Sequence, residues 1–149
     1  MRISFFGHSS FYDSDGYKDR TIKLLEELIG DKDVEFYLGC HGGFDRFAYS
    51  CCKEYKRKHA SASLILVTPY ITESAKGLHA AKLYYDAIIY PPIENVPPKF
   101  AIVHRNRYMV DCSDVVIFYI NHPFGGAYNI YTYALRKKKE IYNIYEKDF

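Results

Sequence analysis

Short apolar runs alternate with amphipathic stretches along the whole chain, and this alternation restricts the fold more than any other feature of the sequence. The runs cover residues 3–6, 34–38, 64–67, 87–90 and 115–120, and a sixth candidate covers 141–145. The run at 64–67 has no polar interruption, which is typical of a strand covered on both faces. Strand–helix alternation requires crossover connections. We therefore expect an α/β fold, a three-layer α/β/α sandwich whose mostly parallel central sheet has five or six strands.

The amphipathic stretches between these runs have helical spacing. The clearest stripe runs from Phe44 to Tyr55, with apolar residues at positions i, i+3, i+4, i+7, i+8 and i+11. The expected helices cover residues 22–29, 44–55, 75–85, 100–112 and 127–138. No linker, repeat or low-complexity segment interrupts the pattern, so residues 1–149 are expected to form a single domain.

Composition excludes several classes of protein. The 149 residues are 48% hydrophobic and 26% charged, which excludes a disordered or collagen-like chain. The net charge of +2 is too balanced for a protein that holds a nucleic-acid duplex mainly by neutralising phosphates, so nucleic acid is not expected as a partner.

Targeting and metal signals are missing from the sequence. The charge-free window 115–135 is interrupted at Asn121–Gly126, so no membrane association is expected. The adjacent Cys51 and Cys52 lie on an apolar helix stripe, and no cysteine or histidine pair has zinc-ligand spacing. We expect a cytoplasmic protein without metal or cofactor.

Glycine-rich turns follow two of the expected strands. In an open parallel sheet, ligands bind beyond the carboxyl ends of the strands, which here carry Gly7-His8, Gly39–Gly43, Thr68 and residues 122–126. A glycine turn that opens a helix brings backbone amides close to an anion. The alternative is that these glycines only make tight turns. Two such turns at one sheet edge favour the binding of a phosphate or carboxylate.

Arg105 is the most informative charged residue of the sequence. It shares a helix face with Ile102 and Met109, and this face should pack on the sheet, where an unpaired charge is costly. Either the guanidinium reaches an anionic ligand, for which arginine is well suited, or it pairs internally with Asp111 or Asp114. The sequence leaves both interpretations open.

Three other polar residues are candidates for the same site. Asp45 either complements a helix dipole or accepts a ribose hydroxyl, as acidic residues do in nucleotide sites. His8 and His41 follow expected strands and are able to donate to phosphate, although histidines there are more often ordinary loop residues. The basic runs 53–58 and 136–139 are interpreted as solvated helix faces or ends.

These motifs, taken in order, resemble a known superfamily. Phe5-Phe6-Gly7-His8, then Gly39-x-x-Gly42-Gly43-Phe44-Asp45, then residues 106–114 leading into Gly125-Gly126 are similar to the Rossmann-like SLOG superfamily. That superfamily includes the LOG phosphoribohydrolases and the nucleotide-binding domain of DNA-processing protein A, and this chain looks closest to its YpsA-like, DUF1273 branch. The resemblance implies a Rossmann-like nucleotide-binding domain that associates into homodimers or larger homo-oligomers.

The catalytic motifs of the LOG enzymes match only in part. Arg105 and Met109 match one motif, but Asn106 replaces its lysine; in the other, only Gly125 and Gly126 match, and Thr132 stands where the catalytic glutamate belongs. Threonine cannot serve as a carboxylate general acid or base. The resemblance thus supports a phosphate-binding shell and argues against catalysis.

We therefore expect a non-catalytic module that binds, as a sensor, a nucleotide or nucleotide-derived phosphorylated ligand. The expected ligand-binding residues are Gly7, His8, Gly39, Gly42, Gly43, Asp45, Thr68, Arg105, Gly125, Gly126 and Asn129. One alternative is a LOG-like N-glycosidase acting on nucleoside 5′-monophosphates, with Asp45 or Asp114 as its carboxylate. A second alternative is single-stranded nucleic-acid binding, helped by the 16 tyrosines but opposed by the low net charge.

Overall fold

Six parallel strands form the centre of the molecule in the computed structural model, which describes residues 1–14, 16–70 and 75–145. Their order across the sheet is β4-β3-β2-β1-β5-β6. The strands are β1 (Arg2–Gly7), β2 (Glu35–Leu38), β3 (Ser63–Val67), β4 (Ala87–Ile89), β5 (Val115–Tyr119) and β6 (Glu140–Asn143). Every pair of neighbouring strands is parallel. The expected α/β class and the mostly parallel sheet are confirmed.

Two hydrophobic cores lie on opposite faces of this sheet. Within β1, Phe5 belongs to one core and contacts Phe36, while the next residue, Phe6, belongs to the other and stacks on Phe118. This alternation follows from the two-residue period of a strand. All five residues of β5 are buried, because this strand has helices on both faces.

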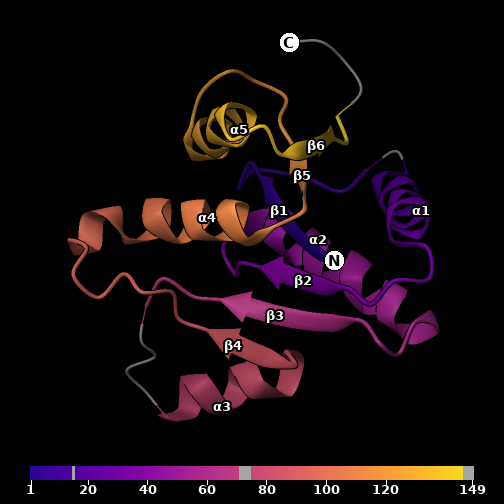
Figure 1. Ribbon diagram of the computed structural model, residues 1–149, viewed down its shortest axis with the longest axis horizontal. Helices are drawn as coiled ribbons and strands as arrows, with labels where there is room; N and C mark the ends of the chain where they lie inside the picture. The colour runs from indigo at the N-terminus through magenta and orange to yellow at the C-terminus, as the bar shows by residue number, and fades with distance from the viewer. Residues whose placement is uncertain (15, 71–74, 146–149) are drawn as a thin grey trace.

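The helices form the two outer layers (Figure 1). They are α1 (Tyr17–Ile29), α2 (Gly42–Lys58), α3 (Ala75–Tyr84), α4 (Ala101–Cys112) and α5 (Gly126–Arg136), with a short 3-10 turn η1 (Pro98–Phe100) before α4. Residues of α1 and α2 pack in one core, and residues of α4 and α5 pack in the other. Among the described residues, no helix combines the length and the apolar character that a membrane span requires.

The helix ends differ from the sequence expectations for local reasons. Helix α5 ends at Arg136 rather than at residue 138, because Lys138 has a positive φ of 56° that a helix cannot accommodate. Helix α2 is longer than its apolar stripe at both ends: it begins at Gly42 and ends at Lys58. Hydrophobic periodicity marks the buried part of a helix but not its polar first and last turns.

The strand order creates a crevice at one point of the sheet. From β1 the chain moves outward through β2, β3 and β4, and then returns to place β5 on the other side of β1. The connections that leave β1 and β5 therefore diverge. In open α/β sheets, ligands bind at this switch point beyond the carboxyl ends of the strands.

Candidate functional site

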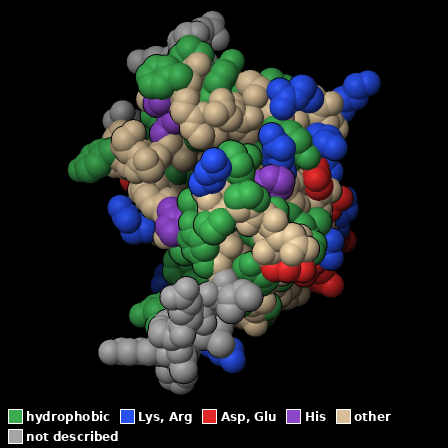
Figure 2. All heavy atoms as spheres, turned by 90° about the vertical axis from the view of Figure 1, so that its left-hand side faces the viewer, with side chains coloured by type: hydrophobic (Ala, Val, Ile, Leu, Met, Phe, Trp, Pro, Cys, Tyr) green, Lys and Arg blue, Asp and Glu red, His purple; other side chains and the backbone are tan. Residues whose placement is uncertain are grey.

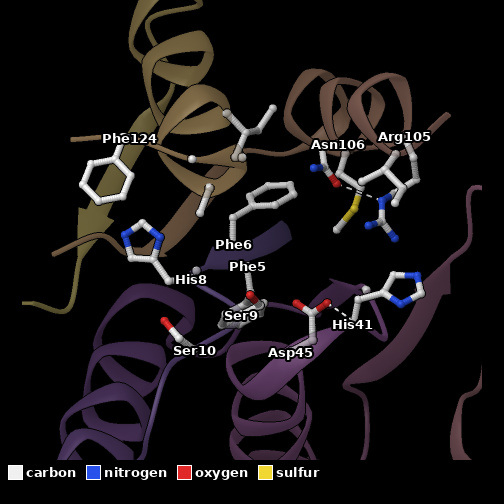
Figure 3. A pocket seen from close by; sticks show the side chains of 18 of the residues that line it. Phe5, Phe6, His8, Ser9, Ser10, His41, Asp45, Arg105, Asn106 and Phe124 are labelled. Atoms are coloured by element: carbon white, nitrogen blue, oxygen red, sulfur yellow. Dashed lines mark hydrogen bonds between the residues drawn. The ribbon is translucent and has the colours of Figure 1, made fainter. Parts of the chain in front are cut away.

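An open pocket of about 370 Å³ lies at this switch point. Its lining comes from the end of β1 and the following loop (5–10), from the β2–α2 connection, from one face of α4 and from the β5–α5 loop with the start of α5. Figure 3 shows His8 and Phe124 on one side of the pocket and Arg105 with Asn106 across from them. Segments that lie far apart in the sequence thus converge on one cavity.

Close backbone packing at two glycines shapes the pocket floor. A Cβ at Gly7 would overlap the ring of Phe44, so glycine allows the end of β1 to pack against α2. A Cβ at Gly39 would lie 2.7 Å from Oδ2 of Asp45 and 3.3 Å from a terminal guanidinium nitrogen of Arg105. Gly39 therefore leaves space between these two side chains.

Arg105 lies at the pocket with a buried guanidinium. Its side chain is 4% exposed; Nη1 donates to the carbonyl of Val67 (2.8 Å) and Nε donates to Oδ1 of Asn106 (2.9 Å). Burial lowers the pKa of Arg105, and the charge of Asp45 opposes this effect. Asp111 and Asp114, the internal partners considered from the sequence, instead accept from the Tyr133 hydroxyl and from the Arg2 amide.

Asp45 faces the same pocket from the first turn of α2. Its Oδ2 accepts the amide of His41, the residue that precedes α2, at 2.8 Å. Burial raises the pKa of Asp45, while the His41 hydrogen bond and the charge of Arg105 oppose that rise. The pocket thus holds one buried cation and one carboxyl group whose ionisation burial makes costly.

The first glycine loop, Gly39–Gly43, is mostly engaged within the protein. The Gly43 amide donates to the carbonyl of Ser9 at 2.9 Å, and the His41 amide is taken by Asp45. Gly42, with a φ of 87°, packs against Ser9. Gly42 and Gly43 therefore hold the β1–α1 loop in place, and neither lines the pocket.

The second glycine turn opens directly onto the pocket. Gly125 and Gly126 both line it, and a Cβ at either position would meet nothing within 4 Å. Gly125 adopts φ 94° and ψ 175° as the residue that precedes α5. Such a backbone conformation is essentially restricted to glycine.

Besides Gly42 and Gly43, two further residues expected at the site lie outside its lining, Thr68 and Asn129. Thr68 closes its own turn, since its hydroxyl donates to the carbonyl of Tyr70 at 3.1 Å. Asn129 is exposed on α5, and its carbonyl accepts the Thr132 hydroxyl at 2.8 Å. Of the eleven residues proposed from the sequence, Gly7, His8, Gly39, Asp45, Arg105, Gly125 and Gly126 line the pocket.

Sequence reasoning missed two rings at the pocket, those of His122 and Phe124. The His122 ring stacks on His8 with centroids 3.5 Å apart, and Phe124 follows at 4.2 Å from His122. His8 and His122 are far apart in the sequence, and only the adjacency of β1 and β5 brings them together. The one feature of the sequence that could have pointed to His8 and His122 is that each follows an apolar run.

The pocket side of the molecule carries few acidic groups. Figure 2 shows the side to which the strands point in Figure 1; histidine and basic side chains are spread there among hydrophobic ones, and acidic side chains gather toward one edge. A chain with a small net charge thus presents a locally favourable surface to an anion.

Comparison with known proteins shows which fold this is. No family model matches the chain. It is 27% identical over 135 residues to the uncharacterised SPbeta prophage-derived protein YoqJ of Bacillus subtilis, with 78% of this chain and 79% of YoqJ covered.

Two solved structures share the architecture. DNA processing protein A (DprA) from Streptococcus pneumoniae aligns over 94% of this chain with a TM-score of 0.63 and 17% identity. DprA from Helicobacter pylori, described for its single-stranded DNA binding mode, aligns over 95% with a TM-score of 0.61 and 19% identity. This chain spans 48% and 63% of those two chains. The fold is the Rossmann-like fold of the DprA proteins.

These neighbours overturn two expectations from the sequence. A nucleotide-sensing module was the leading hypothesis and nucleic acid was not expected as a partner, yet the neighbours are DNA-processing proteins, one of them described for binding single strands. The physical reason for the error is the use of net charge. A balance of +2 argues against neutralising many phosphates of a duplex, but a single strand is also held by base stacking and by a few local cations.

Proposed function

We propose that this protein binds single-stranded DNA in the pocket at the carboxyl ends of β1, β2 and β5. The observation that carries the proposal is the likeness, over 95% of this chain, to a DprA protein described for its single-stranded DNA binding mode. The pocket lies at the switch point of the sheet, where this class of fold takes its ligands.

The chemistry of the pocket supports a single strand. Binding of unpaired nucleic acid combines cations that meet the phosphates with rings on which bases stack. Arg105 supplies a desolvated guanidinium for a backbone phosphate, and Gly125 with Gly126 presents the start of α5, where backbone amides favour anions. His8 and Phe124 supply rings on the opposite side, and the ring of His122 contacts both of them.

The shape of the site also discriminates against a duplex. A stacked base pair does not expose the faces of its bases, whereas an unpaired base is free to turn into an open pocket. Few cations line the cavity, so the phosphate contacts are few. We therefore expect a weak salt dependence compared with proteins that hold duplex DNA by its backbone.

We also propose a superfamily branch, a domain organisation and a cellular compartment for this protein, as the sequence led us to expect. We assign the chain to the YpsA-like branch of the SLOG superfamily, as one domain covering residues 1–149. We place it in the cytoplasm, where Cys40, Cys51, Cys52 and Cys112, all free thiols, would stay reduced.

Fluorescence anisotropy with a labelled oligothymidine of about 15 nucleotides tests the proposal. The wild-type protein is expected to bind this strand at low salt and to bind a duplex of the same length more weakly. Absence of binding to the single strand at low salt, or stronger binding to the duplex, would contradict the proposed function.

The salt dependence tests the role of Arg105. Each neutralised phosphate of a single strand contributes about −0.7 to the slope of log K against log salt. We expect Arg105→Met to weaken binding and to flatten the slope by about 0.7, the contribution of one phosphate. Lys58→Met is the matched control, because it removes one exposed positive charge from the far end of α2. Equal slopes for both variants would exclude a phosphate contact by Arg105.

A further inference from the structure

Three rings form a continuous stack along one side of the pocket, which we call the ring ladder (His8, His122 and Phe124). His8 and His122 lie nearly parallel, with an interplanar angle of 14° and centroids 3.5 Å apart. Phe124 follows His122 with a centroid separation of 4.2 Å and an angle of 40°. The ladder therefore runs from the end of β1 to the loop before α5.

The inner end of the ring ladder is anchored in the hydrophobic core. His8 is 7% exposed, its amide donates to the carbonyl of Tyr119, and its ring meets the Tyr119 ring edge-on. Tyr119 in turn packs against Phe11, Tyr17 and other core rings. The buried end of the ladder thus has a fixed position.

The middle of the ladder is held by local bonds. Nδ1 of His122 donates to Oδ1 of Asn121 at 2.6 Å, and the amide nitrogen of the Asn121 side chain donates to the Tyr119 hydroxyl at 3.4 Å. Pro123 fixes its own φ and restricts the backbone of His122. The ring of His122 is therefore oriented before any ligand arrives.

The outer end of the ladder is open to solvent. Phe124 is 66% exposed although one of its faces is covered by His122. A large apolar ring that is immobilised and left uncovered loses little conformational entropy when a flat ligand stacks on it. His8 lines the pocket at the inner end, where its Nε2 atom is buried and has no hydrogen-bond partner among the described residues. A buried polar atom of this kind is costly unless a ligand or water satisfies it.

We propose that the ring ladder is the stacking platform for one unpaired nucleobase, which lies on the outer face of Phe124. This inference rests on the proposed function and adds to it the residue that receives a base. Stacking uses the face that all four bases share, so the platform takes any base.

A comparison of two single-stranded oligomers, one with bases and one without, isolates the contribution of base stacking on Phe124. We measure the affinity of the wild-type protein and of Phe124→Ala for oligothymidine and for an oligomer of equal length and charge whose residues are abasic. The substitution is expected to weaken binding of oligothymidine about tenfold or more and to change binding of the abasic strand less than about twofold.

Three results would overturn the inference, and they separate it from the proposed function. Equal losses on both strands would mean that Phe124 acts through the fold or the backbone, and no loss on either strand would mean that no base lies on it. In both cases single-stranded DNA binding itself stands. If the wild-type protein binds neither strand, the proposed function and this inference fail together.

The absence of tryptophan from the sequence gives a second, direct readout. Phe124→Trp places the only indole of the protein at the end of the ladder, and its fluorescence is expected to be quenched by oligothymidine but not by the abasic strand. Leu135→Trp, at a 51% exposed position near the other end of α5, is the matched control and should not respond. An unchanged signal from Phe124→Trp in the presence of bound oligothymidine would exclude the stack.

Discussion

Arg105, which is buried, and Asp45, which is partly buried, face one pocket from different helices. A charge removed from water is costly unless hydrogen bonds and an opposite charge offset the cost. For Arg105 the Val67 carbonyl, the Asn106 amide oxygen and the charge of Asp45 provide this offset. The guanidinium is therefore held in one orientation at the pocket. A fixed orientation is what the recognition of a phosphate by a planar guanidinium requires.

His8 makes the stability of the protein depend on pH. Burial, and then the neighbouring His122, lower the pKa of His8 from its ordinary value of 6.5. The unfolded chain therefore binds a proton at this residue more readily than the folded one, and folded stability falls as pH drops below about 6.5. We expect the melting temperature to decline between about pH 7.5 and about pH 5.5, and His8→Gln to reduce that decline.

The informative quantity is the difference in melting temperature between the wild type and His8→Gln at each pH, because the other groups titrate equally in both proteins. His104→Gln is the control, because it removes an exposed histidine from α4. If His8→Gln leaves the pH dependence unchanged, the buried neutral imidazole does not contribute to it.

At the scale of single residues, the sequence predicted the site in part. Arg105 was identifiable because a cation on an apolar helix face is costly to bury unless a partner or a ligand offsets the cost. The ring ladder was not, because an isolated histidine after a strand has no distinctive pattern, and its stacking partner is supplied by a neighbouring strand. Gly42 and Gly43 were expected to cradle a ligand, but a glycine turn has the same sequence whether its amides face a ligand or a neighbouring loop.

Among the elements, the start of α5 is the one whose backbone most constrains the site. Gly125 holds φ 94° and ψ 175° between Phe124 and Gly126, the first residue of α5. An alanine would have to occupy a strained region, at a cost of about 1–3 kcal/mol. Space is not the obstacle, because a Cβ there would meet nothing within 4 Å.

We expect Gly125→Ala to lower the melting temperature by about 3–9 °C for a domain of this size. Gly126→Ala is the matched control: its φ lies outside the positive region and it is the first residue of α5, where alanine favours the helix. Thermal unfolding followed by circular dichroism should therefore show a loss for the first variant and none for the second. Equal losses would mean that backbone strain at Gly125 is not what selects glycine.

Strands and helices were largely predictable because their burial leaves a periodic pattern. The runs at 64–67 and 115–120 correspond closely to β3 and β5, and the stripe from Phe44 to Tyr55 lies inside α2. Helix ends were less predictable, because they depend on single backbone conformations such as that of Lys138. The order of the strands has no local signal at all, since it is decided by how the finished layers pack.

Across the whole molecule, the position of β1 between β2 and β5 determines where the pocket lies. The switch point brings residues 7–10, the β2–α2 connection and the β5–α5 loop to one edge of the sheet. The same arrangement explains why net charge misled: what matters to a single strand is the local distribution of cations and rings at this edge.

A second basic surface lies at the opposite edge and is the natural competitor. Arg107, Arg136 and Lys137 surround the ring of Tyr133 at 5.3–5.9 Å, at the C-terminal end of α5. Such a cluster would attract nucleic acid by charge alone. We assign the strand to the pocket and not to this cluster.

Amide hydrogen exchange of the full chain, with and without saturating oligothymidine, tests this assignment most directly. We expect bound strand to slow exchange in residues 7–10, in residues 122–127 and in the first turns of α4, and to leave residues 136–139 unchanged. Slower exchange confined to residues 136–139 and the adjoining end of α4, with no change around the pocket, would contradict this assignment.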